Sequence, residues 1–180
     1  FDQYVVDIDY GSGTLTLLEA PAYEYKGAGA VLPLSLEHRI PVLEATIETR
    51  KVGALPARLH LDLGSSGYAL RLATTFVRAH DLANDTTALH GLLGVGVGGV
   101  IEGELMRLPA LSLGKFAIHR PSAALSNETG GAFGLSADAD GAIGAPVWSR
   151  MHVIIDYSRA RVILEPRGNF TLPDPVSNTG

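Results

Sequence analysis

The chain has 180 residues, of which 46% are hydrophobic and 18% charged, and its formal net charge is −5, which indicates a globular protein with a substantial core and argues against disorder. The negative charge and the lack of a Lys- or Arg-rich run argue against nucleic acid as a partner, and the apolar runs are too short for a membrane-spanning helix. The absence of cysteine excludes disulfides, thiolate metal sites and a cysteine nucleophile.

Short runs of apolar and β-branched residues, separated by scattered glycines and prolines, predict a mostly β fold. The expected strands are residues 4–9, 14–18, 31–36, 42–49, 57–61, 69–72, 99–105, 110–113, 153–156 and 161–164. One short helix is expected between Thr74 and Leu82, because apolar residues recur there at helical spacing and Thr74 or Thr75 could cap its start.

The two ends of the chain carry an internal repeat. Residues 1–17 match residues 148–164 without gaps, so that Asp9 corresponds to Asp156 and Leu17 to Leu164, both at an offset of 147. Each copy predicts a hairpin whose first strand ends in Ile-Asp-Tyr. Because Phe1 is not Met and lies in mid-strand, we also expect a processed or excised piece of a longer protein.

The repeat predicts how the chain is divided. Residues 1–20 would be the closing hairpin of a preceding lobe, and 21–41 a linker and the strand that leads into the next lobe. Residues 42–167 would form that second lobe, and 168–180 a C-terminal tail.

A single carboxylate stands out in residues 59–67, Leu-His-Leu-Asp-Leu-Gly-Ser-Ser-Gly. The apolar, alternating approach predicts a strand that delivers Asp62 into a turn, where backbone N–H groups and the hydroxyls of Ser65 and Ser66 can hydrogen-bond its charged form. An Asp that merely starts a turn has the same local sequence. His60 would share the face of Asp62 and either adjust its acidity or simply pack.

A second motif lies downstream, where Asp-Gly-Ala-Ile-Gly-Ala-Pro-Val-Trp at 140–148 leads into the apolar strands 153–156 and 161–164. Together with Asp62-Leu63-Gly64, it resembles the retropepsin-like aspartyl proteases of bacteria over roughly residues 33–166. The resemblance implies a closed β-barrel lobe with a flap hairpin and one short helix. It assigns the catalytic carboxylate to Asp62, supported in its loop by Gly64, Ser65 and Ser66. Behind them, Ala142, Ile143 and Gly144 would close a ψ-shaped loop of strands.

One residue departs from the family pattern. The family has Thr or Ser directly after the aspartate, and that hydroxyl braces the two active-site loops, whereas Leu63 cannot hydrogen-bond through its side chain. The resemblance therefore implies an aspartic-type endopeptidase, with a catalytically inactive peptide-binding or assembly domain as the alternative.

Aspartic-protease chemistry needs two carboxylates about 3 Å apart, one protonated and one ionised. This lobe offers only Asp62, so the second Asp would come from a homodimer mate or from an upstream lobe. Asp9 and Asp156 occupy equivalent positions in the repeat and are expected only to form turns. The expected partner is a peptide or protein substrate, and the family resemblance implies a periplasmic or secreted location.

The glycine-rich residues 91–100 match a dinucleotide-binding pattern through Gly94, Gly96 and Gly99. We expect no cofactor there, because no predicted strand directly precedes the segment and an alternating strand rather than a helix follows it. The resemblance instead implies a flap over the substrate, with Gly96, Gly98 and Gly99 near the bound peptide.

Other catalytic classes have weaker support. The six histidines show no metal-ligand spacing, so no metal site is expected. A serine nucleophile at Ser65 or Ser66 lacks the Gly-x-Ser-x-Gly elbow.

Overall fold

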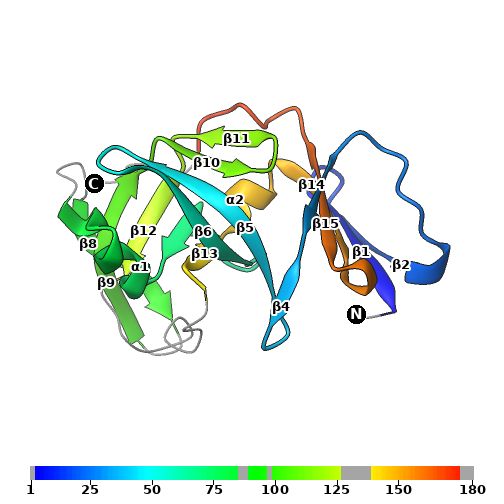
Figure 1. Cartoon of the computed structure of the whole chain (residues 1–180), viewed down its shortest axis with the longest axis horizontal. Helices are drawn as coiled ribbons and strands as arrows, with labels where there is room; N and C mark the ends of the chain where they lie inside the picture. Colours follow the sequence, from blue (N-terminus) through cyan, green and yellow to red (C-terminus); the bar gives the residue numbers. More distant parts are fainter. Residues whose placement is uncertain (1–2, 85–88, 97–98, 127–138, 175–180) are drawn as a thin grey trace.

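The structure is a computed structural model, and it describes residues 3–84, 89–96, 99–126 and 139–174. Two sheets dominate these ranges, a flat one at the right of Figure 1 and a strongly curled one at the left. The helices of the described ranges are all too short or too polar to cross a bilayer.

The flat sheet joins the two ends of the chain. Its strand order is β2-β1-β14-β15-β3. The strands are β1 (Tyr4–Asp9), β2 (Thr14–Glu19), β3 (Ala30–Pro33), β14 (Met151–Asp156) and β15 (Arg161–Pro166). The repeat thus forms two hairpins, β1–β2 and β14–β15, which meet side by side in one sheet.

The pairing of β1 with β14 has local two-fold symmetry. These antiparallel strands pair Val5 with Asp156 and Asp9 with His152. The two pairs are equivalent in the repeat, because Val5 corresponds to His152 and Asp9 to Asp156. The symmetry centre is the pair Asp7–Ile154, whose members are repeat equivalents. The two hairpins are therefore related by a rotation of about half a turn within the sheet.

The two faces of this sheet are packed differently. On one face, Val6 and Ile8 of β1 join the main core, together with Val153, Ile155, Val162 and Leu164. On the other, Val5, Ile154 and Ile163 form a small cluster with Ala20, which Tyr23 and Tyr25 help to cover. The segment between β2 and β3, which includes the 3-10 helix Ala20–Ala22, thus covers the outer face.

The curled sheet forms the barrel. Its strand order is β11-β10-β5-β6-β13-β7-β12-β9-β8, with β4 on the side of β5. The strands are β4 (Ser35–Glu37), β5 (Ile40–Thr49), β6 (Gly53–Leu61), β7 (Leu70–Leu72), β8 (Leu89–Gly96), β9 (Gly99–Arg107), β10 (Ala110–Leu113), β11 (Phe116–His119), β12 (Ser122–Ser126) and β13 (Gly141–Ile143). In the long strands β5 and β6, buried residues alternate with more exposed ones, as a sheet with one core face requires.

The helices are short. They are α1 (Thr74–Ala79), α2 (Ala145–Trp148) and the 3-10 turns Leu82–Asn84 and Tyr157–Arg159. The expectation that Thr74 or Thr75 is the N-cap of α1 is wrong, because the N-cap residue is Ala73, whose side chain makes no capping hydrogen bond. Phe76 and Val77 are buried, so packing rather than capping holds this helix.

Each of the ten predicted strands overlaps an observed one, although the expected strand 69–72 starts one residue before β7 and the expected strand 31–36 is divided into β3 and β4. Four further strands, β8, β11, β12 and β13, have weaker sequence signals. Strand β12 illustrates the reason: Ala123 and Ala124 have low β propensity, but the strand is fixed between β7 and β9 by pairing on both sides.

Candidate active site

Asp62 directly follows β6, which lies beside β13 in the barrel sheet. Strand β13 lies between β6 and β7, parallel to β6 with Ile143 opposite Leu61, and antiparallel to β7. The Asp62 N–H donates to the Ile143 carbonyl at 3.0 Å, which continues this pairing by one residue. The element Ala142, Ile143 and Gly144 therefore lies directly beside the aspartate.

The two oxygens of the Asp62 carboxylate have different surroundings. Oδ1 accepts hydrogen bonds from the backbone N–H groups of Gly64, at 3.0 Å, and Ser65, at 3.1 Å. Within the described ranges, Oδ2 accepts none, and the residue is only partly buried. The loop therefore fixes the carboxylate through one oxygen and leaves the other accessible.

The two serines of the loop have unequal roles. Ser65 contacts the carboxylate through its backbone, and its carbonyl accepts a hydrogen bond from Ala145 at 2.7 Å. Ser66 is exposed, and no hydrogen bond to Asp62 is formed by it within the described part of the chain. Ser65 thus links the aspartate loop to α2.

Gly144 permits this close approach. Its N–H donates to the Ala69 carbonyl at 3.0 Å, and a Cβ at this position would overlap the carbonyl oxygens of Tyr68 and Ser65. By contrast, a Cβ at Gly64 would meet only Asp62 Oδ1, at 3.5 Å. The glycine that the site requires sterically is therefore Gly144.

Leu63 packs against the main core and is partly buried. Its side chain thus makes an apolar contact, whereas the Thr or Ser of the family pattern would join the two active-site loops through a hydroxyl. Trp148, which is fully buried, supplies a different brace, because its Nε1–H donates to the Ile143 carbonyl at 2.8 Å. That carbonyl also accepts from Asp62, so the indole supports the strand end that positions the aspartate.

Trp148 has no obvious signature of this role in the sequence. It matches Phe1 in the repeat, which indicates only an aromatic residue ahead of a strand. Its position just after Gly144-Ala145-Pro146 is the available signal, since one helical turn returns the chain to the end of β13.

His60 is half-buried at the end of β6, two residues before Asp62. Burial lowers the pKa of its imidazole, although the nearby charge of Asp62 acts in the opposite direction. The ring is therefore neutral near pH 7 and presents no positive charge to the aspartate.

The glycine-rich segment forms the hairpin β8–β9. Gly96 pairs with Gly99 at its tip, and the register shifts between Leu92 and Gly94. Gly98 lies outside the described residues. Because a second strand follows β8 without a helix, the hairpin lacks the strand–turn–helix unit that a dinucleotide fingerprint requires.

The remaining aspartates of the repeat hold turns, as expected. Asp9 accepts from the Gly11 N–H at 2.7 Å and from the Ser12 hydroxyl at 2.8 Å. Asp156 is buried and accepts from Ser158, Arg159 and Arg161. Among the described residues, the Asp156 carboxylate thus hydrogen-bonds only within its own hairpin, whereas Asp9 also lies 3.8 Å from the Arg167 guanidinium.

Comparison with known proteins identifies the fold. No family model matches the sequence, and neither does any curated protein. The structure is similar to the crystal structure of a retropepsin-like aspartic protease from Rickettsia conorii, with a TM-score of 0.51 and 15% sequence identity. The match covers 78% of this chain and 96% of that protease. The chain therefore has a retropepsin-like, mostly β fold, and at this identity the likeness concerns the fold alone.

Proposed function

We propose that this chain is the lobe of an aspartic-type endopeptidase in which Asp62 supplies one of two catalytic carboxylates. The observation that supports this most directly is the Asp62 carboxylate itself, held through Oδ1 by two backbone amides and open at Oδ2. In a dyad, one carboxyl stays protonated and polarises the scissile carbonyl, while the other activates a water. A fixed carboxylate with one accessible oxygen suits either role.

We further propose that the second carboxylate comes from a preceding lobe, to which the hairpin β1–β2 belongs. In the second hairpin, Val162 and Leu164 are fully buried in the barrel core. Their repeat equivalents, Leu15 and Leu17, are 62% and 47% exposed. The barrel packs on the hairpin β14–β15. A preceding lobe that packed on β1–β2 in the same way would cover Leu15 and Leu17.

A second copy of this chain is a less suitable source of that carboxylate. The symmetric edge of β14 is already occupied by β1 of the same chain, so a homodimer mate cannot pair there in the same register. A preceding lobe needs no new strand pairing, because its closing hairpin would already lie in the sheet.

The substrate in this proposal is an extended peptide bound between the Asp62 loop and the hairpin β8–β9. Peptides in clefts of this kind gain affinity from main-chain hydrogen bonds to neighbouring strands and loops. The glycines Gly96 and Gly99, which pair at the hairpin tip, would allow the backbone to approach the peptide closely.

A catalytically inactive peptide-binding domain is the second candidate, and Leu63 is the observation that favours it. Its side chain packs on the core and offers no hydroxyl to a partner loop. In a dyad, such a hydroxyl would help hold two carboxylates at close range, where misplacement strongly lowers the rate.

The test uses the full-length protein, with any sequence that precedes Phe1, and a mixed-peptide library at about pH 4 to 7. We expect cleavage that is lost in Asp62→Asn, blocked by a transition-state inhibitor of aspartic proteases and retained in the turn variant Asp9→Asn. Peptide binding without cleavage in the wild type, unchanged in Asp62→Asn, would instead support the inactive domain.

A further inference from the structure

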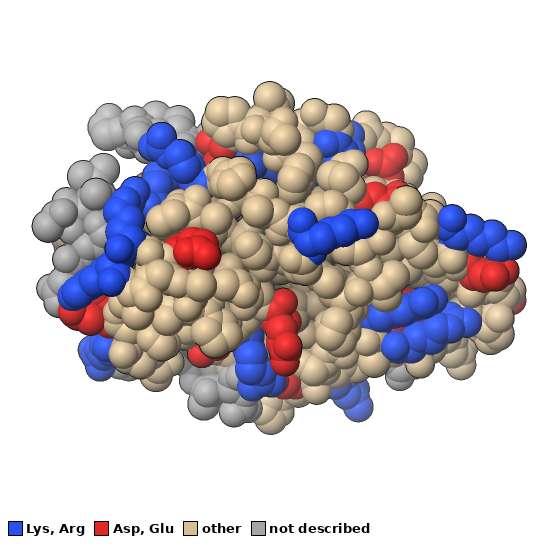
Figure 2. All heavy atoms as spheres, turned by 45° about the horizontal axis from the view of Figure 1, so that its top comes forward, with Lys and Arg blue, Asp and Glu red and all other residues tan. Residues whose placement is uncertain are grey.

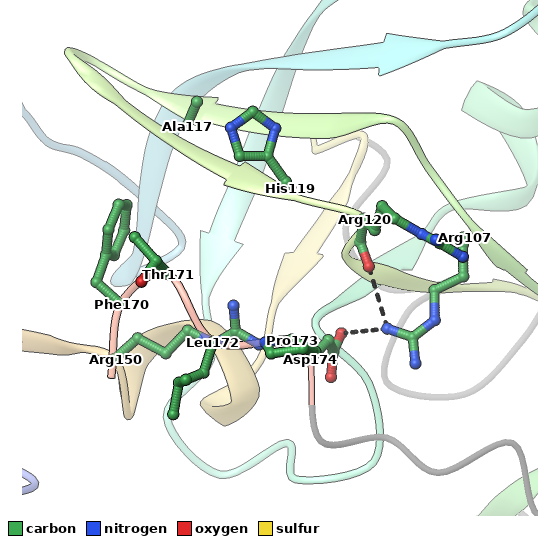
Figure 3. A pocket seen from close by; sticks show the side chains of 10 residues that line it. All are labelled: Arg107, Ala117, His119, Arg120, Arg150, Phe170, Thr171, Leu172, Pro173 and Asp174. Atoms are coloured by element: carbon green, nitrogen blue, oxygen red, sulfur yellow. Dashed lines mark hydrogen bonds and ion pairs between the residues drawn. The ribbon is translucent and has the colours of Figure 1, made fainter. Parts of the chain in front are cut away.

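A cavity of about 560 Å³ lies away from the Asp62 loop. Its walls come from the end of β9, from β11 and Arg120 after it, from Arg150 ahead of β14, and from residues 170–174 (Figure 3). Its size is typical of small-molecule sites. None of its lining residues belongs to the loop 62–69 or to β13.

Asp174 anchors one wall of this cavity. Its side chain is buried, and Oδ2 accepts from the Ser122 N–H and hydroxyl, both at 2.7 Å. The Arg107 guanidinium lies 3.3 Å from the same oxygen and also donates to the Arg120 carbonyl (Figure 3). The negative charge of Asp174 is therefore already matched by Arg107 and by the donors of Ser122.

Arg150 is the unmatched group. It is only 4% exposed, and its guanidinium forms no hydrogen bond or ion pair with another residue of the described ranges. In Figure 3 the guanidinium reaches between Leu172 and Pro173, on the side of the cavity that faces the strand of His119. Burial lowers the pKa of Arg150, and the charge of Asp174 opposes this shift without direct contact. An arginine stays protonated even so.

A cation with so little exposed surface and no directly bonded counter-charge is costly, because it has lost most of its hydration. Around the cavity, Arg107, Arg120 and Arg150 face a single carboxylate, Asp174. This local excess of two positive charges occurs in a chain whose net charge is −5. Elsewhere on the surface, Figure 2 shows a row of basic side chains on the barrel side of the face drawn.

Apart from His119 and Thr171, the rest of the lining is apolar. Phe170 packs edge-on against Phe116, with ring centroids 5.8 Å apart, and Ala117 and Leu172 extend the apolar surface. An arginine at the base of an apolar cavity selects a ligand with one planar anionic group and an apolar body.

We infer that this cavity is a binding site for a small carboxylate with an apolar body, whose carboxylate pairs with Arg150. Two sources share this chemistry: a free aromatic or aliphatic acid, and the C-terminal carboxylate of a short peptide that ends in an apolar residue. The site is separate from Asp62 and does not depend on peptidase activity.

Calorimetric titration tests the inference with two matched pairs of probes. The pairs are 3-phenylpropionate with 3-phenylpropanamide, and N-acetyl-Ala-Phe with its C-terminal amide. We expect each acid to bind at least tenfold more tightly than its amide. Tighter binding of the peptide acid than of 3-phenylpropionate assigns the peptide source, and the reverse order assigns the free acid.

Substitutions test whether Arg150 is the residue that binds the carboxylate. We expect Arg150→Met to lose the preference for acid over amide and to keep or raise the melting temperature, because an unpaired buried charge has been removed. The exposed helix variant Arg78→Gln should bind like the wild type.

Equal binding of acid and amide by the wild type would overturn the inference without reference to any variant. Unchanged acid binding in a folded Arg150→Met protein would overturn the assignment to Arg150. Inorganic phosphate that competes as strongly as 3-phenylpropionate would overturn the requirement for an apolar body.

Discussion

The hairpins β1–β2 and β14–β15 have the same sequence pattern and the same sheet position on either side of a local two-fold axis, but very different environments. Val162 and Leu164 of β15 are fully buried, whereas Leu15 and Leu17 of β2 are largely exposed. A hairpin sequence therefore determines strand, turn and register, while burial depends on what packs against it. The following substitutions test this difference at equivalent positions.

The largest difference should come from the turn aspartates. Asp156→Ala should lower the free energy of unfolding by about 3–5 kcal/mol, because Arg159 and Arg161 would lose a buried counter-charge. Asp9→Ala, in the exposed turn, should have a much smaller effect. Urea unfolding of both variants measures the contrast, and equal losses would contradict it.

The same aspartates predict a pH dependence. Burial alone would raise the pKa of Asp156, but hydrogen bonds from Ser158, Arg159 and Arg161 outweigh it and hold that pKa below its ordinary value of 3.8. Its contribution to stability is therefore complete above pH 3.8 and is lost as the pH falls through the lowered pKa. Acid unfolding of the wild type should be steeper than that of Asp156→Asn.

The second-largest difference in stability should come from the equivalent leucines Leu164 and Leu17. Leu164→Ala should destabilise the chain by about 2–5 kcal/mol, as a cavity in the core does. Leu17→Ala should change the stability of the chain 1–180 by no more than about 0.5 kcal/mol. In a protein that carries the proposed preceding lobe, the loss at Leu17 should be close to that at Leu164. An unchanged small effect there would contradict the proposed preceding lobe.

The junction between the hairpins should respond to pH. Burial alone would lower the pKa of His152. Two carboxylates outweigh this effect and raise the pKa above 6.5: Asp7 lies 2.6 Å from Nε2, and Glu165 lies 3.2 Å from Nδ1. Its stabilisation of about 1 kcal/mol should be complete below pH 6.5 and disappear as the pH rises through the raised pKa.

Unfolding free energies of the wild type and His152→Gln, measured between about pH 5 and 9, should therefore converge at high pH. The exposed His90→Gln variant serves as the control and should follow the wild type. Parallel curves for wild type and His152→Gln would show that the imidazolium does not hold β1 to β14.

The smallest effect should come from the last residue of each turn. Gly13 and its repeat equivalent Ala160 both have left-handed backbones, with φ of +69° and +47°. A Cβ is costly in this conformation, so Ala160→Gly should raise the melting temperature by about 2–4 °C and Gly13→Ala should lower it similarly. Nothing lies within 4 Å of a Cβ at Gly13, so the backbone alone decides the outcome.

The repeat, the strands that alternate clearly and the position of Asp62 beside Ile143 could be predicted from sequence, because they depend on local pattern and motif order. Strand β12 could not, since its small residues acquire strand geometry from neighbours on both sides. Arg150 had no signal at all. Its significance depends on Arg107 and Asp174, which lie far from it along the chain and meet only in the folded protein.

The pairing of β1 with β14 also constrains how the protein is made. About 150 residues separate the partners, so at 5–20 residues per second a ribosome needs roughly 7–30 s after β1 emerges to deliver its partner. During this interval β1 has one edge unpaired and Val6 and Ile8 uncovered, in a form prone to association with other nascent chains. We therefore expect the first hairpin to need protection from association until β14 has been synthesised.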